Sequence, residues 1–520
     1  MNEEIMSPAA IELPPGIKKA ATKRHIRGSS LLMVGQFISK GVTFAIQVLI
    51  VRYLSKSDYG AFAYALSIAA IGETIVTLGL DRAITRFVPI YHEKSDYNKM
   101  FGTILMVLTS LISLGVALIL LFYALQDLLA GRFISDPQAS ALLLILILIA
   151  PIDALDAILT GMFAVFSRPG AIFFRKYILG PGLKLVVVAL LILTGSGVRF
   201  LAIGYVAVDA IVVAIFSVVL FLTLRQLGIF ENFHWETIQV PTREILSFTL
   251  PLLASDLVYV VMHSADVVLL EHFYGTVDVA ALRAVQPTAK MNQMVLMSFG
   301  LLFTPAAARM FARNDREGIN NLYWQNAIWV AVASFPIFAL TFSLAKPITI
   351  LLYGNRYAES AIILALLSFG YYFNAATGQN GLTLKVYGKI RYVVSIDIFV
   401  AALNVGINLL LIPRYGALGA AIGTTTTMVL FNILKQAGLA LGTGVNIFEW
   451  HYARVYVILI LGTVLLWLVQ WLTNAPPVLS ILFAALVSII VFVLNRKALD
   501  VSHTFPELLR IPLLKRIFGS

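Results

Sequence analysis

The 520-residue sequence has no cysteine and few charged residues, since Asp, Glu, Lys and Arg together make up only 12% of it. A soluble protein carries about twice that charged fraction. The lack of cysteine excludes a disulfide framework, a thiolate metal site and a cysteine nucleophile. The charges are grouped between apolar runs of about 20 residues, the length that spans a hydrocarbon core of about 30 Å. The sequence therefore predicts a polytopic membrane protein and excludes a soluble enzyme, a nucleic-acid-binding module and a disordered chain.

The sequence also lacks the motifs of catalysis and of ATP hydrolysis. It contains no G-x-x-x-x-G-K-[ST] loop, no nucleophile elbow and no paired histidines at metal-ligand spacing, and no connection could hold a nucleotide-binding domain. We therefore predict that the protein is not an enzyme and uses no cofactor or metal. Any transport would draw on a gradient of H⁺ or Na⁺, on the membrane potential or on consumption of the product.

The apolar runs predict an all-α protein with about fourteen transmembrane helices. These runs cover residues 29–53, 58–80, 100–124, 140–163, 178–194, 199–224, 247–272, 278–305, 320–345, 359–377, 392–412, 417–441, 454–472 and 477–495. With the N-terminus in the cytoplasm, the cytoplasmic turns and both tails hold 26 of the 38 Lys and Arg residues, and the opposite turns hold 7. This excess predicts that both termini are cytoplasmic, and it accounts for most of the net charge of +11.

Polar and ionisable residues recur on one face of several predicted spans. An ionisable side chain inside a span costs about 2.5–3.5 kcal/mol on insertion scales, so each needs a partner or a role. The aligned sets are Gln36, Lys40, Thr43 and Gln47; Asp256, Tyr259, His263 and Asp266; Arg283, Gln286, Lys290 and Gln293; Asp397, Asn404 and Asn408; and, less regularly, Glu73, Thr77 and Asp81. Two interpretations are open: the sets line a water-filled cavity, or they join neighbouring helices by ion pairs and hydrogen bonds. Three other charged residues lie near span ends or outside such a set and are interpreted as structural: Lys184, Asp209 and Lys435.

Three segments carry a resemblance to a known transporter family. Tyr53–Phe62 (YLSKSDYGAF) joins the first two spans, Gly79–Arg86 (GLDRAITR) closes the second, and Leu410–Ile422 (LLIPRYGALGAAI) joins the eleventh and twelfth. Together with fourteen spans, they resemble the polysaccharide-transport branch (Wzx-type flippases) of the multidrug/oligosaccharidyl-lipid/polysaccharide exporter superfamily. A major-facilitator transporter is disfavoured, because it would have twelve spans and a longer spacing before its Asp-Arg motif.

The resemblance implies two six-helix lobes that form a V around a central cavity, followed by two further helices. The implied parts are a basic tail (1–28), a first lobe (29–224), a cytoplasmic linker (225–246), a second lobe (247–441), two helices (442–495) and a basic tail (496–520). The implied function is that of a flippase of the cytoplasmic (inner) membrane. It would move an undecaprenyl-pyrophosphate-linked oligosaccharide by alternating access, for the synthesis of a surface polysaccharide.

The implied partners are the lipid-linked oligosaccharide, membrane lipids, a polysaccharide polymerase and glycosyltransferases, and not nucleic acid. The alternative function is that of a cation-coupled multidrug exporter of the same superfamily. Cationic and amide side chains of the predicted cavity suit a pyrophosphate, and the candidate substrate-binding residues are Lys40, Arg283, Lys290, Arg82, Arg86, Gln36, Gln47 and Gln286. The candidate ion-coupling residues are Asp256, Asp266, His263 and Glu73. The structural alternatives are that Asp256 or Asp266 only neutralises Arg283 or Lys290, and that Arg82 and Arg86 only set the topology.

Overall fold

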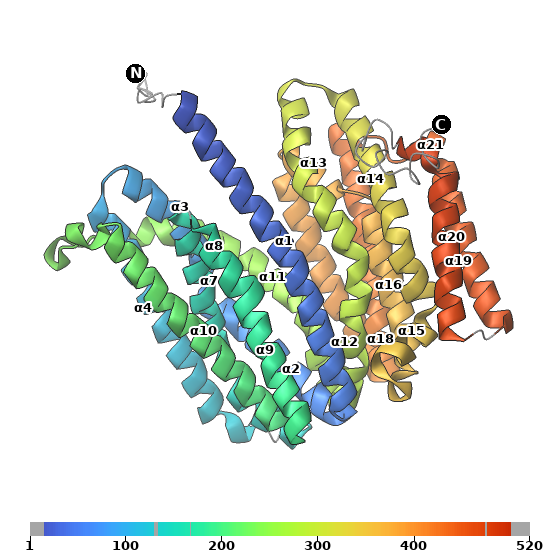
Figure 1. Cartoon of the computed structure of the whole chain (residues 1–520), viewed down its shortest axis with the longest axis horizontal. Helices are drawn as coiled ribbons and strands as arrows, with labels where there is room; N and C mark the ends of the chain where they lie inside the picture. Colours follow the sequence, from blue (N-terminus) through green and yellow to red (C-terminus); the bar gives the residue numbers. More distant parts are fainter. Residues whose placement is uncertain (1–14, 129–133, 167, 474–475, 501–520) are drawn as a thin grey trace.

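The computed structural model describes residues 15–128, 134–166, 168–473 and 476–500, and these residues form helices and no strand (Figure 1). Twelve helices of the described part are long and apolar enough to cross a membrane. The prediction of an all-α polytopic membrane protein is therefore confirmed. The predicted count of about fourteen spans differs from twelve at two places, α11 and α18.

The helix α11 (Thr242–Tyr274) contains the seventh predicted span and lies outside those twelve. Its 33 residues correspond to about 50 Å of helix, which exceeds the thickness of a hydrocarbon core. It packs against α2 and α3 of the first lobe and against α18 of the second. The helix α11 therefore links the two halves of the molecule.

The helix α18 (Ile390–Thr443) is a helical hairpin that contains two predicted spans. A straight helix of its 54 residues would be about 81 Å long, far more than a hydrocarbon core. Gly416 interrupts it at φ 55° and ψ −134°, a conformation that favours glycine. The two arms run antiparallel, since Asn404 Nδ2 of the first arm donates to Thr427 Oγ1 of the second at 2.9 Å. These arms correspond to the eleventh and twelfth predicted spans.

The helices form two groups that converge at one end of the molecule and diverge toward the other (Figure 1). The first lobe, blue to green in Figure 1, contains α1 (Pro15–Tyr53), α2 (Lys56–Thr77), α3 (Leu80–Glu93), α4 (Tyr97–Ala124), α6 (Pro137–Leu146), α7 (Ile149–Val165), α8 (Pro169–Ile172), the π-helical η1 (Phe173–Leu179), α9 (Gly180–Thr194) and α10 (Val198–Gln226). The linker contains η2 (Ile229–Asn232) and η3 (Trp235–Thr237).

The second lobe follows α11 and is drawn in yellow to orange in Figure 1. It contains α12 (Thr276–Lys290), η4 (Met291–Gln293), α13 (Met294–Ala312), α14 (Arg316–Phe338), η5 (Ala339–Ser343), α15 (Ala345–Tyr353), η6 (Asn355–Tyr357), α16 (Ser360–Ala376), α17 (Asn380–Val386) and α18. The chain ends with η7 (Trp450–Tyr452), α19 (Ala453–Thr473), α20 (Pro477–Leu494) and α21 (Arg496–Leu499) beside this lobe. The predicted residue boundaries of the lobes stay predictions, and residues 1–14 and 501–520 of the predicted tails lie outside the described residues.

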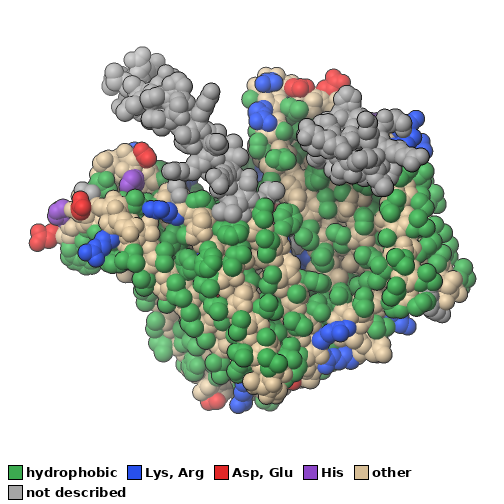
Figure 2. All heavy atoms as spheres, in the orientation of Figure 1, with side chains coloured by type: hydrophobic (Ala, Val, Ile, Leu, Met, Phe, Trp, Pro, Cys, Tyr) green, Lys and Arg blue, Asp and Glu red, His purple; other side chains and the backbone are tan. Residues whose placement is uncertain are grey.

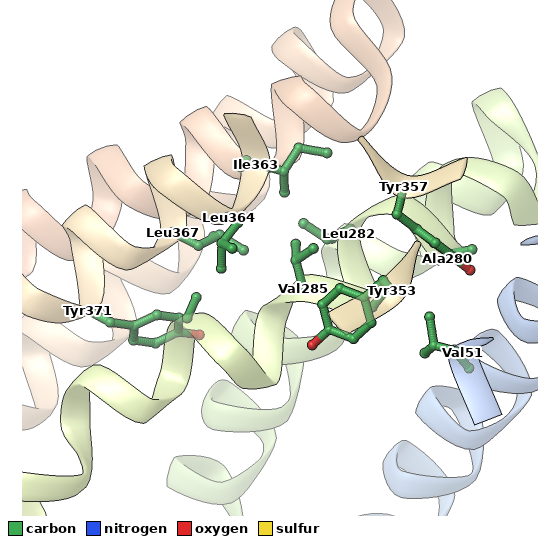
Figure 3. Close-up of a cluster of buried hydrophobic side chains, with 14 of the residues drawn as sticks. Val51, Ala280, Leu282, Val285, Tyr353, Tyr357, Ile363, Leu364, Leu367 and Tyr371 are labelled. Atoms are coloured by element: carbon green, nitrogen blue, oxygen red, sulfur yellow. The ribbon is translucent and has the colours of Figure 1, made fainter. Parts of the chain in front are cut away.

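One buried apolar cluster joins the two lobes at the converging end, where α1 ends and α12 begins. Val51 of α1 lies beside Ala280 of α12 and beside Tyr353 and Tyr357 (Figure 3), and each of these residues is at most 1% exposed. Two further clusters lie almost entirely within the first and the second lobe respectively. Each lobe thus has a core of its own, and the shared core is at the converging end.

Candidate functional site

Hydrogen bonds between the lobes close the converging end. Thr276 Oγ1, at the start of α12, donates to Asp136 Oδ2 of the first lobe at 2.7 Å and lies 3.3 Å from Ser57 Oγ. Glu271 of α11 is fully buried, and its Oε1 accepts the backbone N–H groups of Ser135 and Asp136 at 2.7 and 3.0 Å. The carboxylate therefore satisfies N–H groups at the start of α6, where a helix leaves such groups without partners.

Two arginines also join the lobes at this end, through main-chain carbonyl groups. Arg52 Nε of α1 donates to the carbonyl of Leu352 at 2.8 Å, and its Nη2 donates to that of Leu351. Conversely, Arg356 Nη2 donates to the carbonyl of Arg52 at 2.7 Å and to that of Val51. These contacts and the shared apolar cluster hold the lobes together at the converging end.

Three of the predicted substrate-binding residues, Arg283, Gln286 and Gln47, lie close together. Arg283 of α12 donates from Nη1 to Gln286 Oε1 at 2.6 Å and from Nη2 to Ser67 Oγ of α2 at 3.1 Å. Gln47 Nε2 of α1 lies 3.2 Å both from the Arg283 carbonyl and from the Tyr59 hydroxyl. Arg283 of α12 therefore contacts both α1 and α2 of the first lobe in this conformation.

A cavity of about 380 Å³ lies in the second lobe, and Gln286, Lys290 and Asp266 are in its wall. Asp266 is only 3% exposed. Asp397 is also in the wall, and its Oδ1 forms an ion pair with Lys435 Nζ at 3.1 Å. In contrast, Lys290 forms no ion pair with a carboxylate of the described residues. Lys290 interacts electrostatically with Asp266 of the same wall, without forming an ion pair with it.

The predicted residues at the diverging end bind one another across the lobes. Gly79, at φ 67°, separates α2 from α3 and directs α3 along α11. Arg82 Nη2 of α3 lies 2.7 Å from Asp256 Oδ1 of α11. The guanidinium carbon of Arg86 lies 4.2 Å from the ring centre of Phe248, also on α11. Arg82 and Asp256, predicted for two different roles, are therefore partners in this conformation.

The remaining predicted substrate-binding and ion-coupling residues have fewer contacts with other helices. Lys40 and Gln36 are exposed on α1, and Lys40 Nζ lies 3.8 Å from Met297 Sδ of α13. His263 belongs to α11, but its side chain lies outside the described residues. The structure therefore brings Lys40 near the second lobe and assigns no contact to Gln36.

A charged cavity in the first lobe was missed by the sequence analysis. It has a volume of about 320 Å³ and is lined by Asp153, Asp156, Arg175, Lys176, Lys184 and Asp209, among others. Arg175 pairs with Asp156, and Lys184 Nζ pairs with Asp209 Oδ1 at 2.9 Å. The two aspartates of the apolar run 140–163 were a signal that could have indicated this cavity. Among the described residues, no group of three or more His, Asp or Glu side chains could hold a metal ion.

Glu73 interacts electrostatically with Asp156 and Lys176 of this first-lobe cavity. The predicted ion-coupling residues are consequently spread over three places. Asp266 lies in the second-lobe cavity, Asp256 lies at the diverging end, and Glu73 lies beside the first-lobe cavity.

Solved structures of membrane transporters share this fold. The protein resembles a lipid II flippase MurJ in an inward closed conformation, with a TM-score of 0.67 and 15% identity over 90% of this chain and 99% of that one. It also resembles a multidrug resistance MATE family transporter in an inward-facing conformation, with a TM-score of 0.60 and 15% identity over 76% and 92% of the two chains. The chain therefore shares its fold with these two proteins.

The sequence matches the family model of the polysaccharide biosynthesis proteins over residues 25–311, more than half of its length. The chain therefore belongs to the polysaccharide biosynthesis protein family. The MatE family model also matches, over residues 251–410.

Two curated relatives cover most of the chain. An uncharacterized membrane protein of Methanocaldococcus jannaschii is 21% identical over 77% of this chain and 81% of its own. The succinoglycan biosynthesis transport protein ExoT of Rhizobium meliloti is 24% identical over 68% and 67% of the two chains. The capsular polysaccharide biosynthesis protein CapF of Staphylococcus aureus is 24% identical over 37% of this chain and 48% of its own.

Proposed function

We propose that the protein is a flippase that moves an undecaprenyl-pyrophosphate-linked oligosaccharide across the cytoplasmic membrane. The observation that carries this proposal is Lys290, a cation in the second-lobe cavity without an ion-pair partner among the described residues. Three other cations within the spans are neutralised, in the pairs Arg175–Asp156, Lys184–Asp209 and Lys435–Asp397. The nearby carboxylate of Asp266 acts on Lys290 from beyond ion-pair distance, and a substrate phosphate in the cavity would supply a negative charge in direct contact.

Transport by alternating access agrees with the position of the contacts between the lobes. The excess of Lys and Arg on one side supports cytoplasmic termini, and with them a diverging end that faces the cytoplasm. The converging end, which is closed by hydrogen bonds, then faces away from the cytoplasm. In this conformation a phosphate would reach Lys290 from the cytoplasmic side, with Lys40, Arg82, Arg86, Gln36, Gln47, Arg283 and Gln286 as further substrate-binding residues.

The names of the relatives support a role in the assembly of a surface polysaccharide, since one is a succinoglycan transport protein and another is a capsular polysaccharide protein. A polymerase and glycosyltransferases that make the same polymer are the proposed protein partners. Coupling to H⁺ or Na⁺ through Asp256, Asp266, His263 and Glu73 belongs to the same proposal.

The test is surface polysaccharide export in cells that carry Lys290→Met as the sole copy. We expect export to fall at least tenfold while protein level and membrane insertion stay unchanged. Lys99→Met is the matched control, because Lys99 lies in a surface ion pair with Asp96 and away from the cavity. Full export by the combined variant Arg283→Ala and Lys290→Ala would refute the proposed phosphate site.

A cation-coupled multidrug exporter is the second candidate function. It is favoured by the carboxylate of Asp266 in the wall of the second-lobe cavity, and by the MatE match over residues 251–410. Efflux of ethidium by inverted vesicles distinguishes the two functions. A drug exporter would lose efflux in Asp266→Asn, whereas the flippase gives no ethidium efflux in either form.

A further inference from the structure

A large apolar cavity separates α19 from the second lobe, on the other side of α16 from Lys290. Its volume is about 510 Å³, roughly three times that of an engineered apolar cavity of about 150 Å³ that binds benzene. The aromatic side chains in its wall include Phe338, Phe342, Phe369 and Phe373. Phe338 stacks on Phe342 with a centroid distance of 4.9 Å, so this wall is continuous between α14 and η5.

The polar side chains of the wall already have hydrogen-bond partners within the protein. Tyr456 donates to the carbonyl of Ala376 at 2.9 Å, and Trp324 Nε1 donates to that of Asn446 at 3.2 Å. The remaining bonded polar residues are Tyr372, Thr377, Gln436 and Thr463. Each of these side chains thus already makes a hydrogen bond within the protein, and aromatic and aliphatic side chains form most of the remaining wall. Such a wall suits a hydrocarbon better than a polar ligand.

The cavity opens sideways onto the surface that faces the hydrocarbon of the membrane. Several of its lining residues are also exposed on that surface, including Ile460 of α19 at 62%, Val464 of α19 at 45% and Phe369 of α16 at 40%. Figure 2 shows that hydrophobic side chains cover much of the edge formed by α19 and α20. Lipid chains thus have direct access to the opening, without passing through the polar cavity.

The helix α16 separates this apolar cavity from the cavity of Lys290. Tyr371 and Asn374 face the Lys290 cavity, whereas Tyr372 and Phe373 line the apolar one. The two cavities share no lining residue. Membrane phospholipid is present in large excess over any transported lipid, and it reaches this opening directly. A phospholipid is therefore the expected source of a hydrocarbon chain in the apolar cavity.

We propose that this cavity is a binding site for one acyl chain of a membrane phospholipid, which fills the space between α19 and the second lobe. The acyl chain takes the place of protein side chains, which do not fill the space between α19 and the second lobe. The site is independent of the proposed flippase activity.

The experiment is native mass spectrometry of the full chain in detergent, titrated with phosphatidylglycerol that carries two oleoyl chains. We expect the wild type to keep one phospholipid at detergent concentrations that strip the others. Ile460→Trp places a larger side chain in the opening, and we expect retention of that lipid to fall at least fivefold. Leu461→Trp is the matched control, because Leu461 is equally exposed, at 61%, but does not line the cavity.

Val464→Trp is a second variant at the same opening, to be used if Ile460→Trp does not yield a monodisperse protein. The proposal is overturned if the wild type keeps no phospholipid, or if the cavity variants and Leu461→Trp keep it equally. It is also overturned if the molecule that co-purifies in the site is a polyprenyl phosphate. Selective loss of phospholipid from the cavity variants alone supports it.

Discussion

Arg82 and Asp256 form an ion pair of 2.7 Å that joins α3 of the first lobe to α11. At its opposite end, α11 belongs to the second lobe, where Tyr274 OH donates to the carbonyl of Pro413 at 3.1 Å. The helix α11 is therefore attached to the first lobe near Asp256 and to both lobes at its C-terminal end, where Glu271 binds Ser135 and Asp136. Any relative motion of the lobes has to bend α11 or break one of these contacts.

A charge swap tests whether this ion pair or a substrate phosphate is the functional partner of Arg82. We expect Arg82→Asp and Asp256→Arg each to reduce transport at least fivefold, and the double variant to recover most of it. The pair is partly exposed, so its own contribution to stability is only about 0.2–1 kcal/mol. The measurement is polysaccharide export at matched protein levels, with the same swap at the surface pair Lys99–Asp96 as control. If Arg82 binds phosphate directly, the double variant stays inactive.

A disulfide between residues 57 and 276 should lock the converging end. The chain has no cysteine, so two introduced cysteines are the only thiols. Ser57 Oγ and Thr276 Oγ1 are 3.3 Å apart, which places the two substituting sulfur atoms close together. We expect Ser57→Cys with Thr276→Cys to cross-link under mild oxidation, to stop transport, and to recover on reduction. Transport that continues in the fully cross-linked protein would show that this end need not open.

Removal of the Glu271 carboxylate should weaken the same closure. Glu271→Ala removes the acceptor of the N–H groups of Ser135 and Asp136, and a hydrogen bond to a charged group contributes about 1.5–3 kcal/mol. We expect the rate of the 57–276 cross-link to fall several-fold, because the lobes separate more often. Glu236→Ala, in the exposed linker, is the control. An unchanged cross-linking rate would mean that Glu271 only supports α6.

The ion-coupling hypothesis is best tested at Asp266, which lies in the Lys290 cavity and is nearly buried. An ion shifts a conformational equilibrium only through its different affinities for the two states. In proteoliposomes that contain the lipid-linked donor, we expect an imposed H⁺ or Na⁺ gradient to accelerate flipping severalfold in the wild type and not in Asp266→Asn. Glu236→Gln should behave like the wild type. Flipping that ignores both gradients in all three proteins argues for a purely structural Asp266.

The connection between α18 and α19 should become less stable in acid. Asn320 and Asn446 donate hydrogen bonds to Glu449 Oε1 at 2.8 and 2.6 Å, and they lower the pKa of Glu449 below its ordinary 4.5. A lowered pKa means that this stabilisation is complete above pH 4.5 and is lost as the pH falls through the folded-state value. Thermal unfolding in detergent from pH 7 to pH 3.5 should show this loss in the wild type and a smaller one in Glu449→Gln. Identical pH profiles of the two proteins would contradict this role.

The transmembrane spans and the pairing of Arg283 with Gln286 could be predicted from the sequence, because both follow from local patterns. Apolar length predicts helices, and a spacing of three or four residues predicts which side chains of one helix share a face, as for Arg283 with Gln286. Partners on different helices depend on how each helix is rotated and tilted. The pairs Arg82–Asp256 and Arg175–Asp156 are therefore absent from any local pattern. Glu271 was missed for another reason, because its partners are backbone N–H groups that every residue carries.

The arginine contacts at the converging end affect how this protein can tolerate substitution. Arg52 and Arg356 donate to the main-chain carbonyls of Leu351, Leu352 and Val51, and a carbonyl oxygen is present whatever side chain stands there. A saturation library should therefore accept many residues at the exposed acceptor position Leu351 and few at the two donor positions, whereas Val51 is constrained by the buried apolar cluster. In a family alignment the two arginines would show no compensating exchange with any other position, so covariation methods would not detect this contact between the lobes.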